Sequence, residues 1–174
     1  MCAAEETLRG KYGNESVPPT SSVAGTISAV LKFAATPDGS REQHRLLHDA
    51  EKLCRKFRMS DKRFWHIRVK AFAESEQWSN LRSMVENRKP PIGYKPFARA
   101  AIRGKRPASE IMRYIDPITS PEEKYDLLCE AAMWKEALAI AENLKDIRRV
   151  LNVKSLCNNP SLQLQAEEIM GRLA

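Results

Sequence analysis

Residues 61–74 read DKRFWHIRVKAFAE, and the spacing of their apolar side chains predicts a helix that is covered on two sides. At about 100° per residue these side chains span an arc of about 200°, whereas a helix that packs on one side needs only about 100°. The members of this wide arc are Phe64, Trp65, Ile67, Val69, Ala71 and Phe72. Ser60 directly precedes the segment and is a residue type that caps helix N-termini. The sequence therefore predicts a helix sandwiched between neighbouring helices.

The remaining arc of about 100° on this helix is basic. It is formed by the side chains that we call the basic ridge, namely Lys62, Arg63, His66 and Lys70. A solvated helix face is the ordinary alternative to a binding surface for such a ridge. Arg68 falls inside the apolar arc, so we expect its charged end either to reach solvent or to meet a carboxylate.

Apolar residues recur at helical spacing on both sides of this segment. Three further sets each predict one stripe along a helix, namely Val23, Ile27, Val30, Leu31 and Ala34; Leu46, Ala50, Leu53, Cys54 and Phe57; and Leu162, Ala166, Ile169, Met170 and Leu173. Residues 36–40 read TPDGS and predict a turn. No stretch alternates apolar and polar residues as a strand would, so the pattern favours an all-α protein.

An internal repeat organises these helices. Residues 74–87 resemble residues 130–143, and each copy places a tryptophan, Trp78 or Trp134, at a predicted helix start, 56 positions apart. Turns are expected at residues 75–77, 104–106 and 132–133, with a period of about 28 to 34 residues that is typical of an α-solenoid. Arg106 stands where the middle copy predicts an aromatic residue, so that copy is divergent.

Prolines indicate where further helices begin. Residues 120–123 read SPEE, which predicts an N-cap serine with proline at the first helical position. Pro107 is expected at a first helical position too, and a helix at Pro96 should follow the extended connector 89–95, although a polyproline II ligand is an alternative for that connector. We therefore predict an α-solenoid of stacked antiparallel helix hairpins with irregular repeats over residues 22–174, after a flexible leader at residues 1–21.

Charge is concentrated in the first two thirds of the chain. Lys and Arg number 29 against 22 Asp and Glu, for a net charge of +7, and residues 88–106 hold seven basic side chains and no acidic one. Such a chain can meet nucleic acid, anionic lipid or an acidic protein surface. No apolar run approaches the roughly 18 to 20 residues of a membrane span, and the N-terminus has no secretory signal pattern. The four cysteines are therefore expected to be free thiols in a reducing compartment.

Motifs for catalysis are missing from the sequence. It contains no HExxH, GxxxxGK[ST], GxSxG or GxGxxG pattern, so we expect neither an enzyme nor a cofactor. His44 and His48 lie four positions apart and could share a metal, but two ligands make a poor site, and exposed histidines are the preferred interpretation. Residues 56–70 mix basic and aromatic side chains as some nucleic-acid-binding proteins do, yet the periodicity buries the rings that stacking would need.

The run DKRFWHI at residues 61–67, then Trp78, then PIGYKPF at residues 91–97 resembles the C-terminal helical domain of the vacuolar protein sorting-associated protein sixteen family. Members of this family are core subunits of the class C tethering complexes HOPS and CORVET. The resemblance implies a non-enzymatic α-solenoid scaffold, cytoplasmic and peripheral on late endosome and vacuole or lysosome membranes. Full-length members carry an N-terminal β-propeller, and no part of this sequence predicts one.

In the family this region carries a Sec1/Munc18-type SNARE regulator. The resemblance therefore implies that the basic ridge docks this protein, with Arg63 leading and Lys62, His66 and Lys70 beside it. Other class C subunits are the further expected partners, with only indirect membrane contact through the complex, no nucleic acid, and a homodimer of the isolated domain as a further option. Two alternatives stay open, which are a basic helical nucleic-acid-binding domain and a helical-repeat module of another pathway.

Overall fold

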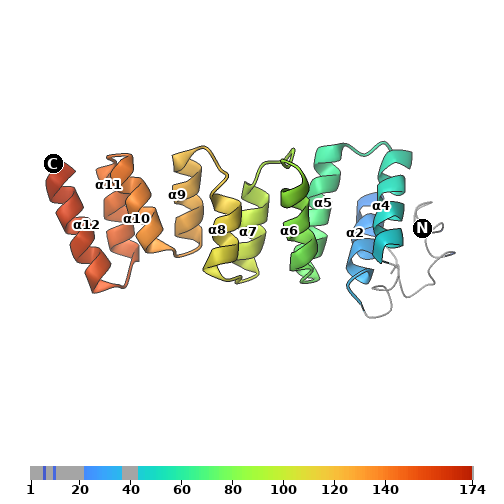
Figure 1. The fold of residues 1–174 in the computed structure, drawn as a ribbon, viewed down its shortest axis with the longest axis horizontal. Helices are drawn as coiled ribbons and strands as arrows, with labels where there is room; N and C mark the ends of the chain where they lie inside the picture. The colour runs from blue at the N-terminus through green and yellow to red at the C-terminus, as the bar shows by residue number, and fades with distance from the viewer. Residues whose placement is uncertain (1–5, 7–9, 11–21, 37–42, 174) are drawn as a thin grey trace. The chain divides into compact units, whose positions relative to one another are not determined.

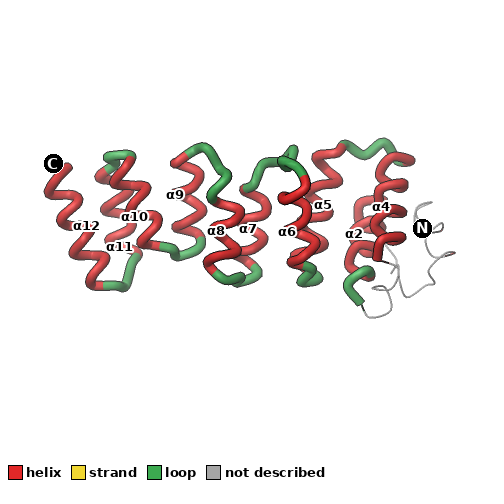
Figure 2. Tube along the Cα trace, in the orientation of Figure 1, coloured by secondary structure: helices red, strands yellow, loops and turns green. Residues whose placement is uncertain are grey.

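The computed structural model describes residues 6, 10, 22–36 and 43–173. Throughout residues 22–36 and 43–173 the regular elements are helices and no strand occurs, which confirms the all-α prediction (Figures 1 and 2). The helices are α2 (Val23–Phe33), α4 (Gln43–Lys56), α5 (Asp61–Glu74), α6 (Trp78–Asn87), α7 (Lys95–Arg103), α8 (Ala108–Ile115), α9 (Pro121–Glu130), α10 (Trp134–Asn143), α11 (Ile147–Leu156) and α12 (Pro160–Leu173).

The chain divides into two compact units, residues 1–96 and 97–174. In the first unit α2 packs against both α4 and α5, and α5 also packs against α6 (Figure 1). In the second unit α10 packs against α9 and α11, and α11 packs against α12. Within each unit this side-by-side packing of neighbouring helices is compatible with an α-solenoid.

Helix α5 has the bounds that the periodicity predicts, residues 61–74. Five residues of the predicted apolar arc are buried and the sixth, Ile67, is half-buried. Because α2 and α6 both pack against α5, the wide arc has a neighbour on each side, as predicted. The Ser60 cap is also confirmed, since the backbone N–H of Arg63 donates to the Ser60 hydroxyl oxygen at 3.4 Å.

The repeat is confirmed at its helix starts. Trp78 begins α6 and Trp134 begins α10. Ser120 caps α9 by accepting a hydrogen bond from the backbone N–H of Glu123 at 3.2 Å, and Pro121 occupies the first helical position. These local signals hold because a cap and a first-turn proline act on backbone groups within the same few residues.

Five helices end in the same kind of turn. In each, the second residue after the end of the helix is a non-glycine residue with a positive φ of 50° to 57°, and these residues are Arg58, Glu76, Lys105, Ala132 and Lys145. After α9, for example, the N–H of Met133 donates to the Leu128 carbonyl at 2.9 Å and the N–H of Ala132 to the Cys129 carbonyl at 3.0 Å. This is the Schellman arrangement, and three of the five turns lie where the repeat predicts them.

Some predicted boundaries were wrong. Pro107 is the N-cap of α8 and not its first residue, because its ψ of 147° is extended. Helix α7 begins at Lys95, one residue before the predicted start. Helix α11 was not predicted at all. Gly93 has a positive φ of 72° in a turn in which its N–H donates to the Pro90 carbonyl. The predicted leader, apart from residues 6 and 10, and most of the turn at residues 36–40 lie outside the described residues.

Arg106, at the divergent position of the repeat, has a role of its own in the second unit. Its Nε donates to the carboxylate of Glu110 at 2.8 Å, and Glu110 is only 6% exposed. A buried carboxylate needs a partner of this kind, because an unpaired charge is costly to remove from water. An arginine therefore replaces the expected aromatic ring at a site that holds an ion pair.

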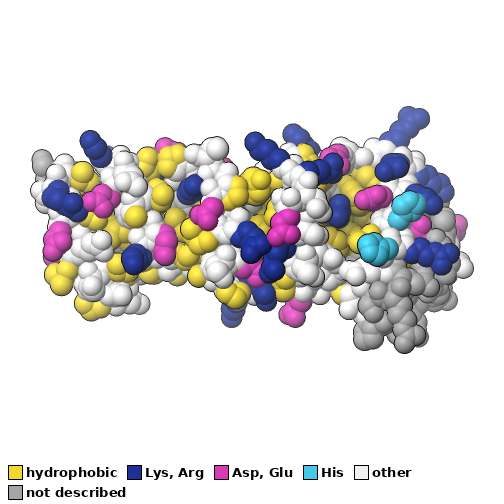
Figure 3. All heavy atoms as spheres, in the orientation of Figure 1, with side chains coloured by type: hydrophobic (Ala, Val, Ile, Leu, Met, Phe, Trp, Pro, Cys, Tyr) yellow, Lys and Arg dark blue, Asp and Glu magenta, His cyan; other side chains and the backbone are white. Residues whose placement is uncertain are grey.

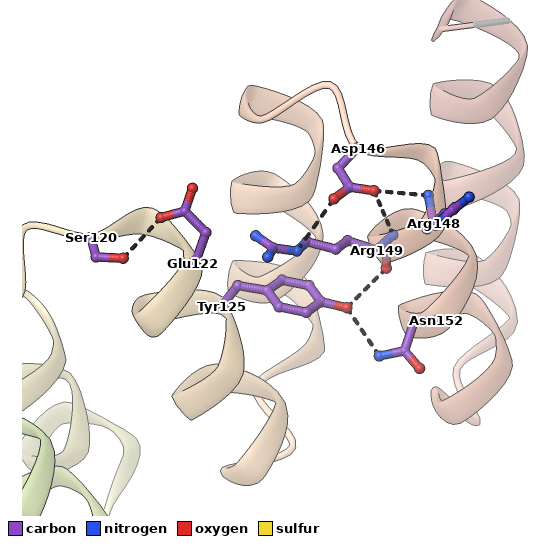
Figure 4. A network of polar contacts seen from close by, with 7 residues as sticks. All are labelled: Ser120, Glu122, Tyr125, Asp146, Arg148, Arg149 and Asn152. Carbon is purple, nitrogen blue, oxygen red and sulfur yellow. Dashed lines mark hydrogen bonds and ion pairs between the residues drawn. The ribbon is translucent and has the colours of Figure 1, made fainter.

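A polar network joins α9 to α11 in the second unit (Figure 4). The phenol of Tyr125 donates to the backbone carbonyl of Arg149 at 3.0 Å and accepts from the amide of Asn152 at 3.0 Å. Asp146 caps α11 by accepting from the backbone N–H groups of Arg148 and Arg149. The side chain of Tyr125 thereby fixes the start of α11 against α9.

Candidate partner-binding surface

The four side chains of the basic ridge are exposed on α5. They lie opposite the buried arc, because a helix places residues that are 180° apart on opposite faces. Helices α2 and α6 hold the buried arc from both sides, so the ridge is presented on a supported helix. That the ridge binds a partner stays a prediction.

The ridge is only partly neutralised by carboxylates. Lys70 Nζ lies 3.8 Å from Glu74, whose carboxylate is shared with Lys32 of α2 at 2.6 Å. Within the part of the chain that the structure describes, the side chains of Lys62, Arg63 and His66 have no ion pair. The positive charges of Lys62 and Arg63 are therefore available to an acidic group from outside, with the imidazole of His66 beside them.

Arg63 also lines an open hollow of about 400 Å³ between the start of α2 and the linker that joins α4 to α5. Its walls combine apolar and basic side chains with the N-terminal ends of two helices, and the residues are Ser22, Val23, Ala24, Phe57, Arg58, Met59, Ser60 and Arg63. A wall that offers guanidinium groups beside apolar surface can receive an acidic side chain together with its neighbouring apolar groups.

Arg68 lies over the aromatic rings of the buried arc. It is half-buried, and its guanidinium carbon lies 5.6 Å, 5.8 Å and 5.7 Å from the ring centres of Phe64, Trp65 and Phe72. Its Nε is buried and, among the described residues, has no hydrogen-bond partner. Burial lowers the pKa of Arg68, while the charge of Glu51 acts in the opposite direction. Contact with the aromatic faces therefore stabilises the guanidinium alongside the charge of Glu51, because ring faces attract cations.

Arg88, at the C-terminal end of α6, is a neighbour of the ridge that sequence reasoning missed. Its guanidinium carbon lies 4.8 Å from the centre of the Trp65 ring, and its Nη2 lies 3.8 Å from the Asp61 carboxylate. Arg88 thus contacts the first residue of α5 and a ring of its buried arc. The periodicity of the sequence could not predict the contact between residues 61 and 88, because this contact depends on how α5 and α6 pack.

Other reactive side chains do not gather near the ridge. His44 and His48 are exposed on α4, and within the described ranges no three or more His, Cys, Asp or Glu side chains come together as a metal site. Burial raises the pKa of the Cys54 and Cys129 thiols, which disfavours the reactive thiolate form.

In the described ranges, no helix has both the length and the apolar character to cross a membrane. The described surface therefore offers positive charge for binding.

Three comparisons relate the chain to known proteins. The family model described as "Vps16, C-terminal region" matches residues 43–172, which include the whole basic ridge. The chain is 28% identical over 127 residues to vacuolar protein sorting-associated protein 16 of Saccharomyces cerevisiae, covering 71% of the chain and 16% of the yeast protein. It is 27% identical over 124 residues to the vacuolar protein sorting-associated protein 16 homolog of Dictyostelium discoideum, covering 71% of the chain and 15% of that protein.

A plant protein is similar over a shorter stretch. Protein VACUOLELESS1 of Arabidopsis thaliana is 30% identical over 97 residues, which are 56% of the chain and 11% of the plant protein. The chain therefore spans only a small part of the length of the curated relatives it matches. No solved structure was found to match it.

Proposed function

The chain belongs to the family of the Vps16 C-terminal region, and on that basis we propose that it is a scaffold of a vesicle-tethering complex of the HOPS or CORVET type. It acts without catalysis in transport from endosomes to the vacuole or lysosome, at the cytoplasmic side of those membranes. The names of the yeast and Dictyostelium relatives, which are vacuolar sorting proteins, support this role. The scaffold comprises residues 22–174, and residues 1–21 serve as its leader.

The partner in this proposal is a Sec1/Munc18-type SNARE regulator, bound through the basic ridge. The observation that carries it is the exposure of Lys62, Arg63 and His66 on a helix whose other face is held by two neighbours. A binding surface on a supported helix loses little conformational entropy when the partner docks. Other subunits of the class C complex bind elsewhere on the scaffold.

Arg63 is the central residue of this docking surface. Among the described residues its guanidinium has no ion pair, and it lies on the wall of the hollow beside the start of α2. Arginine is over-represented among the residues that dominate binding energy, because it contributes charge, directed hydrogen bonds and stacking at once. Reversal of its charge should therefore weaken docking far more than reversal of an isolated surface charge.

Co-purification with a Sec1/Munc18-type protein tests the proposal. The parent chain is expected to retain this protein, and Arg63→Glu is expected to lose it. The matched control is Lys135→Glu, which makes the same change in net charge at an exposed residue of α10 and should leave retention unchanged. Circular dichroism checks that each variant is folded. Retention by Arg63→Glu at the parent level would show that the ridge assignment is wrong, and no retention by the parent would reject this partner.

Nucleic-acid binding is the weaker alternative. Phe64 and Trp65 are buried at 6% and 2% exposure, so α5 offers these rings to no base. Only phosphate contacts remain for the ridge, and those weaken steeply as salt is added. A gel shift at low and at raised salt separates the two functions, because absence of a shift at low salt excludes nucleic acid.

A further inference from the structure

Helix α4 has an exposed face made only of basic residues. Every exposed side chain of this 14-residue helix is His, Lys or Arg. These residues form what we call the α4 basic face, and they are His44, Arg45, His48, Lys52, Arg55 and Lys56. Figure 3 shows dark blue and cyan side chains gathered over this helix. The α4 basic face is separate from the basic ridge, which lies on α5.

The opposite side of α4 explains how this face is oriented. Leu46, Ala50 and Leu53 are buried, and α4 packs against α2. Of the two acidic residues of the helix, Asp49 is buried and Glu51 is half-buried, so neither is among its exposed side chains. The basic side chains therefore project from a helix about 21 Å long into solvent.

In the part of the chain that the structure describes, no exposed large apolar side chain accompanies these charges, although Lys56 Nζ lies 5.7 Å from the ring centre of half-buried Phe57. Among the described residues, the exposed large hydrophobic side chains are Ile147, Leu151, Leu156 and Leu164, all of which belong to α11 and α12. The α4 basic face thus lacks the aromatic or aliphatic anchor that dominates most protein–protein interfaces. It also lacks the apolar residues with which an amphipathic helix enters a bilayer. The α4 basic face can therefore attract a binding partner mainly through its positive charge.

We propose that the α4 basic face binds the anionic phospholipid surface of a membrane directly. Clusters of four to eight Lys and Arg side chains on an amphipathic helix fit such a surface, where each contributes a similar increment of binding. The face holds four Lys and Arg side chains and two histidines. It carries no Asn, Gln or aromatic side chain with which to read or stack on bases, so a nucleic acid fits it less well. This contact goes beyond the proposed scaffold function, and it adds a direct membrane contact to the indirect one through the complex.

Lys52 and Arg55 are the residues to change in a test. Both are exposed, and within the described ranges neither has an ion pair that its loss would disrupt. The probe is a suspension of phosphatidylcholine vesicles with and without phosphatidylserine, and the readout is co-sedimentation of the full chain. The parent is expected to sediment only with vesicles that contain phosphatidylserine, and added salt should release it. Because each basic residue near the surface contributes about a fivefold factor, Lys52→Gln/Arg55→Gln should bind about 30-fold more weakly.

The matched control is Lys135→Gln/Arg148→Gln, which removes the same charge from exposed residues of α10 and α11 and should bind vesicles like the parent. Binding of the parent to neutral vesicles, equal binding by the α4 double variant, or equal loss in the control would each overturn the proposal. So would binding of the parent to duplex DNA at a salt concentration at which it ignores the anionic vesicles. The α4 double variant should still co-purify with the Sec1/Munc18-type protein, which distinguishes failure of this proposal from failure of the docking proposal.

Discussion

The side-chain amide of Gln77 donates a 2.7 Å hydrogen bond to the backbone carbonyl of Leu31, although the two residues are 46 positions apart. Gln77 is buried at the turn between α5 and α6, and Leu31 lies in the last turn of α2. The bond thus satisfies a carbonyl at the end of one helix from the turn of the next hairpin. It joins α2, one of the two helices that support the basic ridge, to the turn that follows α5, the helix that carries the ridge.

Replacement of Gln77 by methionine should destabilise the first unit. Methionine preserves the length of the side chain and is the residue at the corresponding position of the second copy, Met133, but it cannot donate a hydrogen bond. We expect the free energy of unfolding to fall by about 1 to 3 kcal/mol, the cost of leaving a buried polar group unpaired. Urea unfolding measures this change. Gln165→Met, at an exposed residue of α12, is the control and should change stability little; equal losses in both variants would contradict the role of this bond.

Glycine should stabilise the turn after α9. Ala132 has a φ of 54°, and a side chain in this left-handed region costs about 1 kcal/mol that glycine avoids. We therefore expect Ala132→Gly to raise the free energy of unfolding by up to about 1 kcal/mol despite the entropy that glycine adds to the unfolded chain. Ala139→Gly is the matched change inside α10, at an exposed residue, and should lower it by about 1 kcal/mol. Urea unfolding measures both changes. If the turn has this geometry, the free energy of unfolding rises in Ala132→Gly and falls in Ala139→Gly.

Stability should fall at alkaline pH through Tyr125. Burial raises the pKa of this phenol from 10.0 to about 12 in the folded protein. Between these values the folded state retains the proton that the unfolded state has released, so stability decreases as the pH rises from about 10 to about 12. Below this window Tyr125→Phe should be less stable than the parent by about 1 kcal/mol, because the hydrogen bonds to Arg149 and Asn152 are lost.

Within this window the stability difference between the parent and Tyr125→Phe should shrink, because only the parent carries this titration. Urea unfolding at neutral pH and inside the window measures the difference. Gln165→Met is the control, since this exposed residue does not ionise and the stability of the variant should follow the parent at both pH values. A constant difference between the parent and Tyr125→Phe would mean that this phenol does not govern the alkaline loss.

Local patterns predicted much of the first unit. The bounds of α5, its Ser60 cap and the burial of Phe64 and Trp65 follow from side chains within one or two helical turns of each other. The exposure of the basic ridge follows from the same periodicity. Boundaries were less predictable at Pro107, because proline suits both an N-cap and a first helical position and local geometry alone distinguishes them.

Contacts between helices could not be predicted in this way. The stacking of Arg88 on Trp65 joins residues of two helices, and the hollow beside Arg63 joins the start of α2 to the linker after α4. Arg106 looked like a departure from the repeat until its ion pair with buried Glu110 was visible. Each depends on the direction in which a side chain leaves its helix and on the packing of the next element.

The amino-acid sequence alone thus determined that the protein is helical, where most helices begin, and which faces are apolar or basic. These properties depend on backbone hydrogen bonds and on side-chain spacings within a few residues, so they do not require contacts between distant parts of the chain. Only the tertiary structure decided which side chains meet, including Gln77 with Leu31 and Arg88 with Trp65. Such pairs form when whole helix faces pack closely against each other. The spacing of residues along the sequence does not show which distant residues this packing brings together.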